Sequence, residues 1–154
     1  MFENRKPFRS QEESEFEEKV VQVNRVSKKT KGGNQISFSA LTVVGDRQGK
    51  VGVGLGHSKD VASAINKGMN YAKKHLITVP LRGTTIPHRV KIKFGAAEVL
   101  LKPAPPGSGL IAGGPVRFVV QAAGIKDMSS KILGSSNKAS NVYATFKALK
   151  KLRK

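Results

Sequence analysis

Apolar and polar residues alternate with a period of two along residues 22–57. That period places successive side chains on opposite faces of an extended strand. In the middle of this stretch, one face carries Ile36, Phe38, Ala40, Thr42 and Val44. Glycine-containing turns at 31–34 and 45–49 interrupt the pattern, so it predicts three consecutive strands joined by two turns.

The third predicted strand has one face without side chains. Gly52, Gly54 and Gly56 alternate there with Val51, Val53 and Leu55. Glycine weakens a strand, so a bare face indicates that something approaches the backbone closely. Two candidates remain open. One is a tightly packed neighbouring element, and the other is a ligand, for which we expect a phosphate backbone.

An amphipathic helix is predicted after this strand. Ser58, Lys59 and Asp60 are typical of a helix N-cap with an acid in the first turn. Apolar residues then recur at three- and four-residue steps from Val61 to Leu76. The lysines on the other side are either a solvated face or phosphate contacts, and we favour phosphate because acids are scarce.

The second half of the chain predicts another lobe. Segment 78–88 contains two prolines and a glycine and is typical of a connector. Strands follow at 89–94 and 98–102, with a turn at 95–97. Pro115 suits the start of a short helix that Gly124 ends, and residues 125–133 are strand or irregular. The last helix starts near Asn137 and ends in basic residues.

Charge narrows the choice of partner. The formal net charge is +18, and residues 1–18 hold six of the ten acids, so we expect a flexible acidic tail before a strongly basic body. Such a body repels itself unless a polyanion neutralises it, which favours nucleic acid first and an anionic membrane surface second. No apolar run approaches the roughly 20 residues of a membrane span. The N-terminus is not a signal peptide and cysteine is absent, so cytoplasmic residence is expected.

Catalytic motifs are weak. The run 107–112, GSGLIA, matches a dinucleotide fingerprint, but prolines precede it and Asp127 is the one acid near the required distance. The three histidines are scattered, and the acids after residue 18 are isolated, which argues against an acid–base pair or a metal site. Aromatic residues are few, so the composition favours reading phosphates and RNA shape over stacking on bases.

Seven short runs resemble the bacterial small-subunit ribosomal protein S5 family. They are VNRVSK (23–28), KGG (31–33), FSALTVVGD (38–46) and GKVGVG (49–54) in the first lobe, then LKPA (101–104), GSGLIAGG (107–114) and GSSN (134–137). The resemblance covers about residues 20–146. It departs at the acidic N-terminal tail and at the C-terminus, where many members continue beyond the position of Lys154.

This resemblance implies an α+β fold. An N-terminal α-β-β-β-α domain like a double-stranded-RNA-binding domain would precede a small C-terminal α/β domain. The protein would bind small-subunit rRNA at the head–body junction, beside ribosomal proteins S4 and S8 and near mRNA where it enters the subunit. Arg25, Val26, Ser27 and Lys28 match a loop that affects spectinomycin sensitivity. Gly109 and Arg117 match positions that alter decoding accuracy through contact with S4.

The sequence therefore predicts a structural, non-enzymatic protein of the small ribosomal subunit, with no cofactor, metal, small-molecule substrate or membrane span. We expect a tail (1–18), an RNA-binding domain (19–77), a connector (78–88) and a C-terminal domain (89–154). The residues expected to contact rRNA are Arg25, Ser27, Lys28, Lys29, Lys31, Gly32, Gly33, Asn34, Arg47, Lys50, Gly52, Gly54, His57 and Lys59. Two rival functions are a nucleotide hydrolase using residues 107–114 and a double-stranded-RNA chaperone that does not reside in ribosomes.

Overall fold

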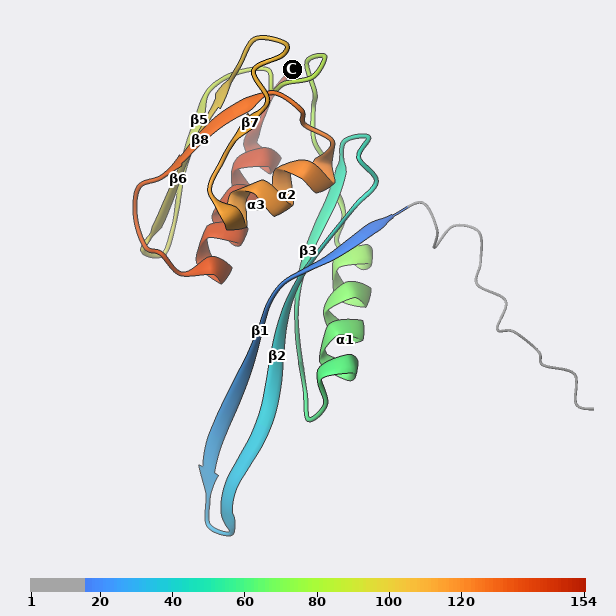
Figure 1. The fold of residues 1–154 in the computed structure, drawn as a ribbon, viewed down its shortest axis with the longest axis vertical. Helices are drawn as coiled ribbons and strands as arrows, with labels where there is room; N and C mark the ends of the chain where they lie inside the picture. The colour runs from blue at the N-terminus through green and yellow to red at the C-terminus, as the bar shows by residue number, and fades with distance from the viewer. Residues whose placement is uncertain (1–15) are drawn as a thin grey trace, which may run out of the picture.

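The computed structural model describes residues 16–154, which form two four-stranded sheets and three helices (Figure 1). The first sheet, in the order β1-β2-β3-β4, contains β1 (Glu17–Thr30), β2 (Gly33–Gly45), β3 (Lys50–Ser58) and β4 (Ile77–Thr78), with α1 (Val61–Lys74) between β3 and β4. The second sheet, in the order β5-β6-β8-β7, contains β5 (Val90–Phe94), β6 (Ala97–Pro103), β7 (Leu110–Ile111) and β8 (Met128–Ile132). Helix α2 (Gly114–Ala123) joins β7 to β8, and α3 (Lys138–Lys151) follows β8.

Strands β1, β2 and β3 form the antiparallel meander that the alternating pattern predicts. The predicted faces of β2 are confirmed by its register, because Ala40, Thr42 and Val44 pair with the three glycines of β3. Ser39, Leu41 and Val43 pair with His57, Leu55 and Val53 on the other face. The register of β1 shifts between Val20 and Gln22, where an irregularity of the β-bulge kind interrupts the ladder.

Helix α1 covers the glycine face of the first sheet. The side chain of Asp60 caps it by accepting a hydrogen bond from the backbone of Ser63, so Asp60 itself is the N-cap and the first turn holds no acid. The buried face of α1 consists of the small residues Ala64, Gly68 and Ala72. A Cβ on Gly52 would lie 2.2 Å from the carbonyl oxygen of Ala72. The helix therefore lies directly on the backbone of β3.

Within residues 16–154, helices cover the second sheet on one face only. Alternate residues of β5 and β6, including Ile92, Val99 and Leu101, are buried on the side where α3 packs. The end of α2 and the start of α3 follow the sequence prediction. Gly124 ends α2 in the left-handed region at φ 89°, and the Asn137 side chain caps α3 by accepting a hydrogen bond from Ala139.

The two sheets share a hydrophobic core. Leu41, Val43 and Val53 of the first sheet belong to the same buried cluster as residues of α2 and α3. The turn between β2 and β3 is bound to the end of α2. The backbone N–H of Arg47 donates to the carbonyl of Ala122 at 3.0 Å, and that of Gly49 donates to Ala123 at 2.9 Å. The segment between β4 and β5 is also packed, since Val79 and Ile86 are buried.

The predicted α+β class with two lobes is confirmed, and the structure differs from the prediction in the start of β1 and in two short strands. Strand β1 begins at Glu17, two residues before the expected start of the RNA-binding domain at residue 19. The helix expected before β1, like most of the tail, falls in residues 1–15, outside the described residues. Strands β4 and β7 were not predicted, because a two-residue strand is too short to show periodicity. Among the helices of residues 16–154, none has the length and apolar character to cross a membrane.

Candidate nucleic-acid interface

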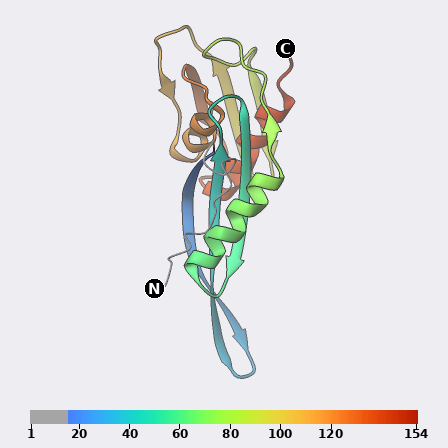
Figure 2. The ribbon, with the colours of Figure 1, turned by 90° about the vertical axis from the view of Figure 1, so that its right-hand side faces the viewer.

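The β1–β2 hairpin extends far beyond the rest of its sheet (Figures 1 and 2). Strand β3 accompanies it only as far as the pair Phe38–Ser58. The antiparallel pairing of β1 and β2 continues from there to Thr30–Gly33. We call residues 25–38 the finger. Among the described residues it is a two-stranded ribbon with no third strand beyond its base, and residues 25–36 are all exposed.

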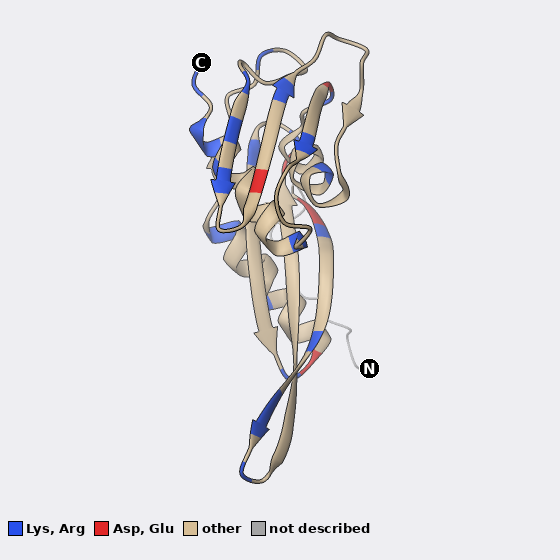
Figure 3. Ribbon diagram, turned by 90° about the vertical axis from the view of Figure 1, so that its left-hand side faces the viewer, with Lys and Arg blue, Asp and Glu red and all other residues tan. Residues whose placement is uncertain are grey.

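The finger carries concentrated positive charge. Arg25, Lys28, Lys29 and Lys31 are exposed, and no acid occurs between residues 19 and 45. The ion pairs found within residues 16–154 involve none of these four cations. Their charges are therefore available to an external anion (Figure 3).

The register distributes these cations over both faces of the finger. Arg25 pairs with Phe38 and Lys29 pairs with Asn34, on the face that carries α1 further along the sheet. Lys28 pairs with Gln35 on the opposite face. Both faces also expose an aliphatic side chain, since Ile36 and Val26 are each 43% exposed. The finger can therefore contact anionic groups on two sides.

The tip is a tight turn with a bare backbone. The hydroxyl of Thr30 donates to the carbonyl of Gly33 at 2.7 Å and closes the turn. Gly33 has a φ of 120°, which L side chains rarely adopt, so glycine is required there by conformation. No atom lies within 4 Å of the position of a Cβ on Gly32 or Gly33. A ligand can thus approach the backbone at the tip, where Asn34 follows.

His57 and Lys59 lie near the base of the finger. His57 pairs with Ser39, next to the last pair of β3 with β2, and Lys59 follows just beyond that last pair. His57 and Lys59 are both exposed. The ammonium group of Lys67 donates to the carbonyl of His57 at 3.3 Å, which brings a further cation from α1 to this base. The sequence did not single out Lys67 from the other lysines of the helix.

Gly52 and Gly54 are not available to a ligand, and their assignment to the rRNA-binding set was wrong. Both are buried, because α1 packs on the face that they leave bare. The sequence left two candidates for this face, a packed neighbouring element and a phosphate backbone. In the structure the neighbouring element, α1, occupies it. The small residues of α1 at steps of four, Ala64, Gly68 and Ala72, were the sequence signal that could have decided between them.

Arg47 and Lys50 lie at the opposite end of the first sheet from the tip of the finger, so the structure does not join them to it (Figure 1). Arg47 is also partly neutralised, since its guanidinium pairs with Glu17. The hydrogen bond from Arg47 lowers the pKa of Glu17 below its ordinary value, with a further contribution from Lys19. Arg47 has a φ of 59°, a left-handed conformation that is uncommon for a residue other than glycine.

A second basic region surrounds the end of α2. A cavity of about 390 Å³ is lined there by Lys19, Arg47, Leu110, Arg117, Gln121, Gly124, Ile125 and Lys126. Arg117, which the resemblance assigns to decoding accuracy, is exposed on α2 at this cavity. The region is therefore a cationic surface formed by both lobes.

Gly109 lies in the loop between β6 and β7 and is bound to a buried carboxylate. Its backbone N–H donates to Asp127 at 2.9 Å, and the hydroxyl of Thr84 donates to the other oxygen of the same carboxylate at 2.5 Å. Asp127 is only 5% exposed. The hydrogen bond from Thr84, followed by that from Gly109, lowers the pKa of Asp127. Asp127, an isolated acid in the sequence, therefore fixes the loop to the connector and to β8.

The loop 107–112 does not have the context of a dinucleotide site. It leads into the two-residue strand β7, and α2 starts only at Gly114. Within residues 16–154, His, Asp and Glu side chains form no group of three that could hold a metal ion.

Comparisons with known proteins cover both lobes. Residues 16–80 match the family of ribosomal protein S5, N-terminal domain, and residues 92–154 match the family of ribosomal protein S5, C-terminal domain. The small ribosomal subunit protein uS5 of Chloroflexus aurantiacus is 56% identical over 138 residues, which cover 90% of this chain and 78% of that protein. These are structural proteins of the ribosome in the cytoplasm and not enzymes, as the sequence predicted. By both domains and by this identity, the chain belongs to the ribosomal protein S5 family, a structural component of the small ribosomal subunit.

Proposed function

We propose that this chain binds small-subunit rRNA at the head–body junction through the finger, with His57 and Lys59 contributing at its base. The observation that carries the proposal is the group of four exposed cations on a ribbon that extends beyond the protein core. None of them forms an ion pair with an acid of residues 16–154. Each cation that neutralises a phosphate releases counterions from the RNA, which is the main source of affinity in such contacts.

The finger contacts phosphates and so recognises the shape of folded RNA and not its base sequence. Phe38, the aromatic residue of the finger, is half-buried at its base, and no aromatic side chain lies between residues 25 and 37. The exposed part of the finger therefore offers no platform on which a base could stack. Ser27 and Asn34 add a hydroxyl and an amide that can hydrogen-bond to sugar or phosphate. Residues 25–28 would be the loop whose changes affect spectinomycin sensitivity.

We also propose that the region around Gly109 and Arg117 contacts ribosomal protein S4 and so helps to set decoding accuracy. Arg117 would supply an exposed guanidinium, and the hydrogen bond that Gly109 donates to Asp127 would fix the adjoining loop. Ribosomal protein S8 and mRNA near its point of entrance are further proposed partners. We keep the proposed division into a tail (1–18), domains at 19–77 and 89–154, and a connector at 78–88.

Substitution of Lys28, Lys29 and Lys31 together by alanine tests the finger. Binding of purified small-subunit rRNA is measured across a range of salt concentrations. The slope of log K against log salt should fall by roughly two to three units, since each phosphate contact contributes about 0.9. Lys138, Lys150 and Lys154, exposed residues at the C-terminal helix and end, provide the matched control with the same loss of charge. A finger variant with the slope of this control would remove the finger from the site.

Sedimentation separates the proposed function from the chaperone. In sucrose gradients of a cell extract, this protein should travel with small subunits, whereas a free chaperone would stay near the top. Titration with labelled ATP and magnesium tests the nucleotide hydrolase, and saturable binding at micromolar concentration would favour it.

A further inference from the structure

The cavity at the end of α2 holds more positive charge than the described residues neutralise. Four of the residues that line its volume of about 390 Å³ are cations, namely Lys19, Arg47, Arg117 and Lys126. Glu17 forms ion pairs with the first two of them. Arg117 and Lys126 are exposed, and neither forms an ion pair with an acid in the described part of the chain. The cavity therefore suits a further anionic group.

The start of β1 lies at the rim of this cavity. The carboxylate of Glu17, the first residue of the strand, contacts the two lining cations Lys19 and Arg47. The ammonium group of Lys19 also donates a hydrogen bond to the side chain of Gln121 on α2 at 3.3 Å, and Gln121 lines the same cavity. The N-terminal segment therefore joins the described fold at the edge of the cavity.

The residues just before this point are strongly acidic. Residues 10–18 contain five glutamates and no cation. Glu15 and Glu13 precede Glu17 by two and four residues, and segments of that length span at most about 7 and 14 Å. The chain itself thus supplies carboxylates within a short reach of Arg117 and Lys126.

Tethering favours this segment over an external partner. A single exposed ion pair contributes little, but several charges in one network contribute more. The contacts of Glu17 with two cations are already part of such a network. A short tether gives the neighbouring carboxylates an effective concentration in the millimolar range, which an external acidic protein or polyanion would have to exceed.

We propose that the acidic segment 12–15 docks in this cavity in the free protein, where the carboxylates of Glu12, Glu13 and Glu15 neutralise Arg117 and Lys126. The docked segment is an intramolecular competitor, so an external anion reaches these two cations only by displacing it. This gives the acidic N-terminal segment a role in a strongly basic chain. The docking does not depend on the proposed contacts with rRNA or S4.

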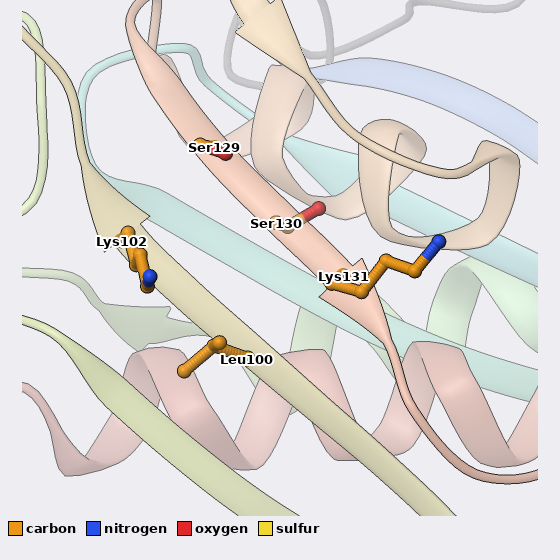
Figure 4. A pocket seen from close by; sticks show the side chains of 5 residues that line it. All are labelled: Leu100, Lys102, Ser129, Ser130 and Lys131. Atoms are coloured by element: carbon orange, nitrogen blue, oxygen red, sulfur yellow. The ribbon is translucent and has the colours of Figure 1, made fainter.

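A smaller hollow on the second sheet provides a matched comparison. It has a volume of about 100 Å³ and is lined by Leu100, Lys102, Ser129, Ser130 and Lys131 (Figure 4). Its two lysines are exposed and form no ion pair within the described residues. The hydrogen bonds and ion pairs of residues 17–19 do not reach it. Loss of these two lysines therefore removes the same charge as loss of Arg117 and Lys126, at a different place.

The test uses the full chain with one nitroxide label. Cysteine is absent from the chain, so Ser10→Cys provides a single attachment site beside the acidic segment. Broadening of the backbone amide signals of Gln121, Gly124 and Ile125 by the nitroxide is measured by NMR. Three variants carry the same label. The tail variant has Glu12→Gln, Glu13→Gln and Glu15→Gln, the cavity variant has Arg117→Ala and Lys126→Ala, and the hollow variant has Lys102→Ala and Lys131→Ala.

The labelled chain with no further change and the hollow variant should show strong broadening at the cavity. The tail variant and the cavity variant should lose most of it. Raising the salt concentration from about 0.1 to 1 M should also remove it, because the Debye length falls from about 10 to 3 Å. Equal broadening in the cavity and hollow variants overturns the inference. The tail variant decides the question if the cavity variant does not fold, because its changes lie before β1.

A mixture of isotope-labelled chains without nitroxide and nitroxide-labelled chains without isotope separates docking within one chain from docking between two. Broadening at the cavity in this mixture would assign the contact to a second copy and would overturn docking within the chain.

Competition is measured by titration with inorganic tripolyphosphate, followed through the amide shifts of Gly124 and Ile125. The tail variant should bind it about three- to tenfold more tightly at the cavity, the factor expected if the cavity is free in about a third to a tenth of wild-type molecules. The amides of Lys28 and Lys29 in the finger report the general effect of the three lost negative charges. An equal gain at the cavity and at the finger would show that the segment does not compete, and would overturn the inference. Failure of the finger to bind rRNA would leave these results unchanged.

Discussion

A Cβ on Gly54 would lie 2.0 Å from the carbonyl oxygen of Gly68, so β3 and α1 meet backbone to backbone at this point of the sheet. The contact is between two main chains, and neither can move away as a side chain would. Gly54→Ala should therefore force the helix off the sheet. We expect the free energy of unfolding to fall by about 1–3 kcal/mol or more, measured by denaturant titration.

The matched control for this change is Gly32→Ala at the tip of the finger. No atom lies within 4 Å of a Cβ at Gly32, so the same chemical change meets open space. Its unfolding free energy should stay within about 0.5 kcal/mol of wild type. A Gly54→Ala protein as stable as Gly32→Ala would show that the helix does not rest on the strand backbone.

The alternation of side chains was enough to predict β1, β2, β3 and their faces, because the period of a strand is a local property. What covers the glycine face is not local. A row of glycines indicates that another group packs closely against the strand backbone. It does not indicate whether that group is a helix or a phosphate. The row of Ala64, Gly68 and Ala72 in α1 is the complementary surface, and only a comparison of the two rows indicates that they pack together.

The grouping of the cations shows a second limit of the sequence. Arg47 and Lys50 are close in sequence to the cations of the finger, but successive turns of a meander lie at opposite ends of the sheet. The predicted meander of three strands already implied that its two turns lie at opposite ends of the sheet. The bonds of Asp127 to Thr84 and Gly109 could not be predicted, because they join residues 43 and 18 positions apart with no pattern between them.

Docking of the two lobes depends on Gly124. Its φ is 89°, and a Cβ there would lie 2.1 Å from the carbonyl oxygen of Arg47 in the turn of the other lobe. Gly107 has nearly the same φ, 90°, but no atom within 4 Å of a Cβ. Gly107→Ala should thus show the conformational cost alone, about 1 kcal/mol.

Gly124→Ala should lose a further 1–3 kcal/mol or so, since overpacking is added to the conformational cost. Hydrogen exchange gives an independent readout. The amides of Arg47 and Gly49, which donate to Ala122 and Ala123, should exchange faster in Gly124→Ala than in Gly107→Ala. Equal stability and equal exchange in the two variants would mean that the lobes are not held together at this turn.

The carboxylate of Asp127 should make stability depend on pH. The hydrogen bond from Thr84, the largest cause, and that from Gly109 lower the pKa of Asp127 below its ordinary value of 3.8. A lowered pKa in the folded state means that the stabilisation is fully present above the unfolded pKa. It is lost as pH falls through the folded value. The stability difference between wild type and Asp127→Asn should therefore be constant near neutral pH and shrink in acid.

Thr84→Val identifies the origin of this effect. It removes the hydroxyl that donates to Asp127 but introduces no titratable group. In acid, the free energy of unfolding of Thr84→Val should fall less steeply than that of wild type, because the pKa of Asp127 moves back toward its ordinary value. The two substitutions should be strongly coupled at neutral pH in a double-mutant cycle. Additive effects at neutral pH would show that the Thr84–Asp127 bond does not stabilise the fold.

Gly109 and Arg117 should act on the proposed S4 contact by different physical routes. Arg117 is exposed on α2, so Arg117→Ala should leave the unfolding free energy within about 0.5 kcal/mol of wild type. Gly109 has a φ of 74° and open space for a Cβ, so Gly109→Ala should cost about 1 kcal/mol through backbone conformation and displace the loop.

Truncation of an interface arginine weakens binding by about tenfold when it removes about 1.4 kcal/mol. Titration of purified S4 should show this tenfold loss of affinity for Arg117→Ala. Gly109→Ala should also bind S4 more weakly, and the backbone amides of its loop should show faster hydrogen exchange. Lys138→Ala, on α3, is the control. If both variants bind S4 as this control does, the accuracy contact lies elsewhere on the chain.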